Sequence, residues 1–319
     1  MRYNGALLLY LSYYDNALTR ILNSFLSTEG ILMMNKKLLL TAVLAVGLMS
    51  TGLTHAADKT HRGLYLGLFA GGAGVENSSF SQSATAYSRA GVAGAKATYD
   101  LQVNSQGTMQ TDTAAFGGFH VGYEFSEIPF AQDWAVRPAV EFEGYYLKTE
   151  QSGYLTNGQL EPTVGNLKYS LPAGTPTFKE SMDLDVGVMM LNGILSFKTP
   201  WSDSIFPYIG GGVGANISAK RSVVSTQLTP VYEPTINHFN ADDNGSRSGF
   251  AAQAKAGIRV EVMDHVSVFA EYRYLYASEN NYTFGPTFYP LEHARTSEWD
   301  NHFSSLNVHS GVLGVDYAF

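Results

Sequence analysis

The chain has 319 residues, no cysteine and a formal net charge of −8. The lack of cysteine excludes disulfides, thiol catalysis and thiolate metal sites, and the acidic balance argues against nucleic-acid binding. Its 32 glycines, 20 tyrosines and 18 phenylalanines are spread without a break in composition, which indicates a single domain after the N-terminal region.

The N-terminal region has the pattern of a bacterial export signal. A positive segment at residues 35–37 is followed by an apolar stretch at 38–53, and Ala56 precedes Ala57 at a small-x-small cleavage pattern. We therefore predict a secretory signal peptide over residues 34–56, removed by cleavage after Ala56.

The segment before this signal, residues 1–33, is interpreted as an extension from a start codon assigned too early, with Met33 or Met34 as the alternative first residue. The predicted mature domain is residues 57–319. Removing the first 56 residues takes away four basic and two acidic residues and leaves a net charge of about −10.

Period-2 alternation of apolar and polar residues predicts an all-β mature domain. The connections between the predicted strands alternate in length, roughly 38, 8, 32, 6, 29, 2 and 28 residues. This predicts an antiparallel up-and-down transmembrane barrel with four long extracellular loops and three short periplasmic turns. The eight predicted strands are residues 62–75, 114–125, 134–148, 181–198, 205–219, 249–262, 265–277 and 306–319.

The content of the strand faces indicates which side meets lipid. A soluble barrel with an apolar lumen would show the same alternation. However, strands 249–262 and 265–277 each carry a long unbroken apolar face, and tyrosines lie near the strand ends. These features fit a tilted transmembrane strand with an aromatic girdle. The sheet must then close, because unpaired backbone groups have no water to bond in hydrocarbon.

Charged side chains fall on the opposite, inward faces of these strands. Eight closed strands leave an interior about wide enough to be filled by side chains. An isolated buried ion would cost several kcal/mol, so these charges must pair with one another. We predict a lumen plugged by an ionic network of Glu124, Arg137, Glu141, Glu143, Lys255, Arg259, Glu271, Arg273 and Asp316.

The fourth predicted strand, residues 181–198, has a less regular pattern. Apolar side chains from Leu184 to Met190 lie on one face, whereas Leu195 and Phe197 lie on the other. A β-bulge near residues 190–192 is predicted to bring both sets to the same face.

The C-terminal strand alternates Leu313, Val315, Tyr317 and Phe319, and this ending resembles the assembly signal of outer-membrane barrels. With the glycine-rich runs at residues 63–72 and 206–214, it resembles the OmpA-like or Opa-like group of small eight-stranded barrels. The resemblance implies a monomer in the bacterial outer membrane that contacts lipid, lipopolysaccharide and the barrel-assembly machinery. Because the chain ends at the barrel, no peptidoglycan-binding domain is expected.

Other chemistry has weaker support in the sequence. His302 and Ser304 share a face near the top of the last hairpin, and outer-membrane lipid A deacylases use a similar pair. His293, His302 and His309 lie in the last loop and strand beside Glu292, Glu298 and Asp300, and the third loop holds His238, Asp242 and Asp243. These loops could converge on an ion, but nothing has the spacing of a known metal motif. The glycine runs lack the residues of a nucleotide-binding loop. We therefore predict no metal, no cofactor and no enzymatic activity.

The long loops are rich in Ser, Thr, Asn and Gly with aromatic residues between them. This composition suits polar contacts around aromatic anchors, or else disordered and variable loops. The favoured function is a surface protein whose loops contact host or cell-surface ligands. The alternatives are a small channel, which requires an open lumen, and a lipid A hydrolase that uses His302 and Ser304.

Overall fold

The computed structural model describes residues 63–319, apart from residues 91–97, 165–174 and 291. The predicted signal peptide, its cleavage site at Ala56–Ala57 and the N-terminal extension lie outside the described residues. Within the part that is described, no helix is long and apolar enough to cross a membrane.

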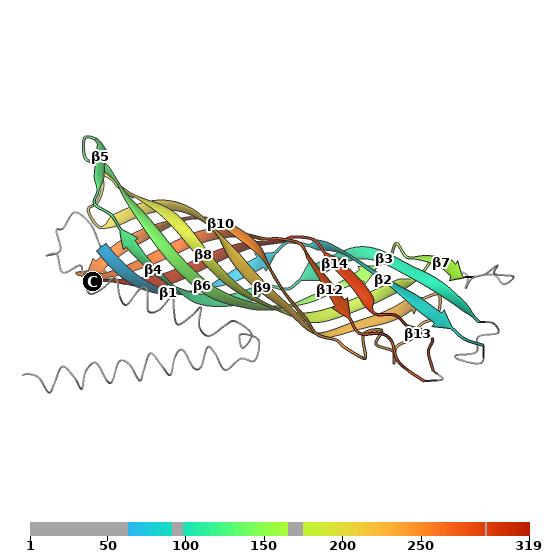
Figure 1. Cartoon of the computed structure of the whole chain (residues 1–319). Coiled ribbons are helices and arrows are strands. Elements are labelled where there is room, and N and C mark those ends of the chain that lie inside the picture. The colour runs from blue at the N-terminus through green and yellow to red at the C-terminus, as the bar shows by residue number, and fades with distance from the viewer. Residues whose placement is uncertain (1–62, 91–97, 165–174, 291) are drawn as a thin grey trace, which may run out of the picture. The chain divides into compact units, whose positions relative to one another are not determined.

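Eight strands form a closed antiparallel ring (Figure 1). Each strand pairs with the next one in the ring, and the last pairs with the first, so that the sheet has no open edge within the barrel. This confirms the predicted eight-stranded up-and-down barrel. The barrel strands are β1 (Gly63–Val75), β4 (Ala114–Glu124), β6 (Trp134–Leu155), β8 (Thr177–Lys198), β9 (Ile205–Thr229), β10 (Gly245–Met263), β11 (Val266–Ala277) and β15 (Leu306–Ala318).

The long connections contain strands that were not predicted from the sequence. One short turn also contains such a strand. In the short turn, β5 (Ile128–Ala131) pairs with the start of β6. The long connections extend the barrel sheet beyond β6, which pairs with β3, in the order β12–β14–β2–β3; we call this extension the loop sheet. Its strands are β2 (Ser78–Ser88), β3 (Tyr99–Thr111), β12 (Asn280–Phe284) and β14 (Trp299–Phe303), with β7 (Gln159–Val164) paired to β3 and β13 (Arg295–Thr296) paired to β2.

The loop sheet lies at the end of the barrel opposite the C-terminus and the short turns (Figure 1). β6 and β8 each have 22 residues, about twice the 9–11 residues that a transmembrane strand needs. Their upper halves expose polar residues to solvent, such as Lys148, Glu150 and Lys179. The barrel wall therefore continues beyond the membrane and carries the loop sheet.

The lower half of the barrel exposes a belt of apolar side chains. On β10 and β11 the exposed residues are those predicted to face lipid, including Ile258, Val268 and Tyr272. Exposed apolar residues at the same end of other strands include Leu68, Val140, Leu191, Leu195, Ile209, Val213, Leu313 and Val315. Such a belt is what a lipid-facing exterior requires.

The fourth barrel strand is present as β8, but the β-bulge predicted near residues 190–192 is wrong. β8 pairs in continuous register with both neighbours from residue 183 to 196, so there is no bulge at residues 190–192. Its register irregularities lie near Thr177 and between Ser181 and Asp183. Leu184, Val186, Val188 and Met190 face inward and are buried. The prediction failed because it assigned every apolar face to lipid, whereas part of the interior is also apolar.

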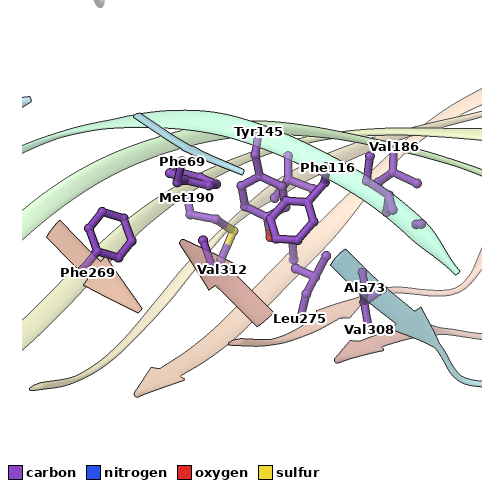
Figure 2. Packing of buried hydrophobic residues seen from close by; sticks show 14 of the residues in the cluster. Phe69, Ala73, Phe116, Tyr145, Val186, Met190, Phe269, Leu275, Val308 and Val312 are labelled. Atoms are coloured by element: carbon purple, nitrogen blue, oxygen red, sulfur yellow. The ribbon is translucent and has the colours of Figure 1, made fainter. Parts of the chain in front are cut away.

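The inward apolar side chains form two separate clusters. One fills the barrel and includes Phe116, Tyr145 and Val186, which Figure 2 shows converging from different strands. The rings of Phe116 and Tyr145 lie 5.8 Å apart. The other cluster lies under the loop sheet and includes Phe239 and Trp299. The part of the protein that carries the loop sheet therefore has a hydrophobic core of its own.

Candidate functional site

The nine charged residues predicted to line the lumen all point into the barrel and are almost completely buried. The periplasmic end holds one group of them. Arg259 Nη2 donates to Glu124 Oε2 at 2.6 Å, and Arg137 lies 3.8 Å from Glu124. The guanidinium of Arg137 also stacks 4.5 Å from the ring centre of Phe206.

A tighter group lies in the middle of the barrel. Lys255 Nζ donates to Glu141 at 2.5 Å and to Glu143 at 2.9 Å. Arg273 donates to Glu143 at 2.6 Å and to Glu271 at 2.7 Å. Each carboxylate therefore meets at least one cation, as burial of charge requires. We call all nine residues, with the polar groups that bind them, the lumen network.

Several members of the lumen network were missed by the sequence analysis. The hydroxyls of Tyr65 and Tyr208 donate to Glu141 and Glu271, both at 3.0 Å. His120 Nε2 lies 2.7 Å from Asp316 Oδ1. Gly67 makes room for that contact, because a Cβ at Gly67 would lie 2.1 Å from the imidazole of His120. Alternation along β4 places His120 on the same face as Glu124, and this signal could have identified it.

The nine predicted residues comprise five carboxylates and four cations, so a protonated His120 would balance their charge. Above the lumen network, Leu147 and Val186 are 2% and 0% exposed. Side chains that line a water-filled channel would be accessible to solvent. The lumen network and the apolar side chains above it are both buried, which indicates that the barrel is closed at these two levels.

The aromatic residues of the loops divide into two groups. Phe239, Tyr282, Phe284 and Trp299 are buried in the core under the loop sheet, and do not act as exposed anchors. Tyr154, Tyr232 and Phe288 are half exposed or more. Tyr169 and the side chain of Tyr99 lie outside the described residues. The loops, as far as they are described, therefore form a packed sheet.

A polar cavity of about 730 Å³ opens on this loop sheet. One row of paired residues crosses four of its strands: Tyr282, Asn301, Gln82 and Ser105. The last three are at most 3% exposed, yet Asn301 Oδ1, both amide atoms of Gln82 and the Ser105 hydroxyl have no hydrogen-bond partner among the described residues. A buried polar atom without a partner costs about 1–3 kcal/mol. These atoms lie within the wall of the cavity and do not form part of its accessible surface.

Around this row the cavity is lined almost entirely by hydroxyl, amide and other polar side chains. We call it the loop cleft. Its remaining lining residues are Ser81, Ser83, Asn104, Gln106, Asn157, Gly158, Gln159, Asn281, Thr283, Asp300 and His302.

The structure does not bring the candidate hydrolase residues together as a nucleophile and base. His302 Nδ1 pairs with Asn281 Oδ1 at 2.7 Å, and its Nε2 lies 3.8 Å from Glu279. Ser304 Oγ instead accepts a hydrogen bond from the backbone N–H of Ser79 at 3.0 Å. Among the hydrogen bonds of the described residues, none joins His302 to Ser304. The pair therefore lacks the activating contact that nucleophilic catalysis needs.

The residues of the predicted assembly signal all face outward. Leu313, Val315, Tyr317 and Phe319 are 49–70% exposed, while β15 pairs along its length with β1 and β11. The C-terminal strand therefore closes the ring and presents its apolar face to lipid.

A closed antiparallel ring with a lipid-facing belt and a charged, filled interior defines the class of bacterial outer-membrane barrels. The chain belongs to the family described as "Outer membrane protein beta-barrel domain", which it matches over residues 41–319. It is accordingly a protein of the bacterial outer membrane. A search of curated protein sequences found no match.

Several solved structures are similar to this chain. Neisserial surface protein A is 13% identical, with 81% of this chain and 99% of that chain covered and a TM-score of 0.32. The attachment invasion locus protein of Yersinia pestis is 13% identical, with 80% and 98% covered and a TM-score of 0.26. OprG from Pseudomonas aeruginosa is 14% identical, with 82% and 100% covered and a TM-score of 0.38. The assignment to the family rests on the family match.

Proposed function

We propose that this protein is a surface-interaction protein that binds a hydroxyl-rich ligand, such as a sugar chain, in the loop cleft. The observation that carries the proposal is the lining of the loop cleft, which consists almost entirely of polar side chains, with accessible hydroxyls and amides such as Ser81, Asn104 and Asn281. Amides and hydroxyls both donate and accept hydrogen bonds, so they match the alternating donors and acceptors of sugar hydroxyls.

Two sources of such a ligand are compatible with an extracellular cleft. One is the polysaccharide of lipopolysaccharide in the same outer leaflet, and the other is a glycan on a host or neighbouring cell. Both present the same hydroxyl chemistry.

The test is a binding titration of the folded protein in nanodiscs against two probes, lipid-free polysaccharide from lipopolysaccharide and an array of host-type glycans. We expect one probe to bind and Asn281→Leu, an exposed change in the cleft lining, to weaken binding at least tenfold. Lys179→Ala, an exposed change on β8 away from the cleft, should leave binding unchanged. Lack of binding to either probe, or equal binding by Asn281→Leu, would contradict the proposal.

The channel remains the alternative function, and the filled lumen argues against an open pore. Leu147, Val186 and the mid-barrel charges would all have to move to admit water.

A further inference from the structure

Loops 3 and 4, residues 230–244 and 278–305, are tied together by hydrogen bonds. Phe288 N donates to Asn240 Oδ1 at 2.8 Å, and Asn240 Nδ2 donates to Phe288 O at 2.9 Å. Thr287 Oγ1 donates to His238 O at 2.8 Å. These hydrogen bonds therefore hold the backbones of the two loops in place without a ligand.

Three metal-binding side chains converge between these loops. Glu233 and His238 come from loop 3, and His293 comes from loop 4. Glu233 Oε2 lies 3.6 Å from His238 Nε2 and 3.2 Å from His293 Nε2. The two imidazole rings are perpendicular, with centres 5.0 Å apart. All three ligand atoms lie within 4.8 Å of one another.

The hydrogen bonds of the two imidazoles set the direction of their lone pairs. His238 Nδ1 lies 2.9 Å from Ser225 O, and His293 Nδ1 lies 2.6 Å from Ala294 O. A carbonyl oxygen only accepts, so each Nδ1 carries the proton. In a neutral ring, Nε2 then presents a lone pair, and both Nε2 atoms face Glu233 Oε2. Such a bond from the distal ring nitrogen to a carbonyl is the usual second shell of a metal-bound histidine.

The distances fit a small divalent cation. Bonds of about 2.1 Å in tetrahedral geometry place neighbouring ligand atoms about 3.4 Å apart, between the observed 3.2 and 3.6 Å. Glu233 Oε2 is buried, and its close polar neighbours are the two imidazole nitrogens. Two lone pairs and a carboxylate oxygen that face one another repel, and either a proton on an imidazole Nε2 or a bound cation relieves this repulsion.

The surroundings favour a shielded site with one open side. The rings of Phe178 and Trp299 lie edge-on to His238, with centres 5.3 and 5.7 Å away. The side chain of His238 is 2% exposed, whereas those of His293 and Glu233 are 12% and 21% exposed. An ion can therefore enter past Glu233 and His293.

We propose that Glu233, His238 and His293 bind a Zn²⁺-class divalent transition-metal ion that joins loop 3 to loop 4, with the remaining coordination position open to water. Two imidazoles and one carboxylate are a ligand set suited to zinc. The proposal departs from the sequence-based expectation of no metal site, and it does not depend on the loop cleft.

A second cluster of similar composition is already filled. His120, Glu141 and Glu143 lie close together inside the barrel. The ammonium group of Lys255 binds both carboxylates, at 2.5 and 2.9 Å. That cation supplies the positive charge that a metal would supply, so we propose no ion there.

The test is a calorimetric Zn²⁺ titration of the folded protein in detergent micelles, with Co²⁺ absorption as a probe of tetrahedral geometry. We expect one ion per chain, with tetrahedral d–d bands in the Co²⁺ form. Both His293→Ala and Glu233→Gln should weaken Zn²⁺ binding at least tenfold and abolish those bands. His302→Ala is the matched control, because His302 lies in the same loop but outside the cluster, where its neighbours are Asn281 and Glu279.

Folding of each variant is checked by the heat-dependent gel shift of the barrel, which a change in the loops should not alter. The proposal is overturned if wild type binds Zn²⁺ no better than His293→Ala, which would leave a histidine–glutamate ion pair only. It is also overturned if His302→Ala removes binding to the same extent.

Discussion

Lys255 is the residue on which the mid-barrel charges depend, because its ammonium group contacts both Glu141 and Glu143. Lys255→Met would leave two buried carboxylates with one fewer cation. We expect a loss of about 3–5 kcal/mol in the free energy of unfolding, as for other broken buried ion pairs. Equilibrium unfolding by urea in micelles measures this.

Lys148→Met is the control for this prediction, because Lys148 is exposed on β6. It should change stability by no more than about 0.5 kcal/mol. Adding Glu141→Gln to Lys255→Met removes one unpaired charge and should recover part of the loss. Equal stability of Lys255→Met and wild type would show that the lumen network does not hold the barrel together.

His238 should make the loops sensitive to acid. Burial lowers the pKa of His238 to about 4, and the nearby charge of His293 adds to the shift. The ordinary value is 6.5, so the folded state favours the neutral ring. The associated stability is fully present above about pH 6.5 and is lost as the pH falls towards and through 4. It amounts to about 3 kcal/mol at 1.36 kcal/mol per pKa unit.

Trp299 reports this transition, since its ring lies 5.7 Å from that of His238. We expect its fluorescence, measured with a chelator present and with Trp134 and Trp201 replaced by Phe, to change between pH 6 and 4. His238→Gln should abolish the change. A profile that is flat over this range in wild type would contradict the prediction.

At the residue level, the sequence identified which side chains point inward but not which ones meet. Alternation alone placed Glu141 and Arg273 inside the barrel. The pairing of Arg273 with Glu143 joins residues 130 apart in the chain and depends on the stagger of strands around the ring. The sequence suggested that His238 and His293 could converge, but it did not identify Glu233 or establish the contact, because the meeting of two loops is encoded by no sequence spacing.

At the level of elements, the loop sheet should be a separate unit of stability. Trp299 is 1% exposed and packs against Phe178 and Phe239. Trp299→Ala should cost about 3–5 kcal/mol and open the loops without unfolding the barrel. Limited proteolysis should then cut within residues 278–305 faster, while the gel shift of the barrel is unchanged.

The control for that experiment is Trp201→Ala, because Trp201 is 79% exposed in a short turn. It should leave the rate of loop cleavage unchanged. Loss of the barrel gel shift in Trp299→Ala would show that loops and barrel fold as a single unit.

The eight barrel strands could be predicted because lipid on one side and packed charges on the other impose a strong alternation. The strands of the loop sheet could not, because β2 and β3 consist largely of Ser, Gln, Asn and Thr. Their inward faces are covered by partners from distant loops, such as Phe303 stacked on Phe80 at 5.3 Å. The bulge in β8 was predicted for a related reason. Leu184 to Met190 were assumed to face lipid, whereas they pack against other side chains inside the barrel.

At the scale of the whole molecule, the filled interior predicts no steady ion conduction. Folded protein added to a planar bilayer should give conductance equal to that of the protein-free membrane. The variant Lys255→Ala/Arg273→Ala, which removes two mid-barrel side chains, is the comparison, provided that its gel shift shows a folded barrel. Stable single-channel steps in wild type would favour the channel function.

We expect the loop sheet to face the cell exterior and the short turns to face the periplasm. Because the chain has no cysteine, single cysteines can be introduced and labelled in intact cells with a membrane-impermeant maleimide. Glu298 in loop 4 and Asp203 in a short turn are both exposed. We predict that Glu298→Cys is labelled in intact cells, and that Asp203→Cys is labelled only after the outer membrane is permeabilised. The reverse pattern, or labelling of neither site in intact cells, would contradict the account.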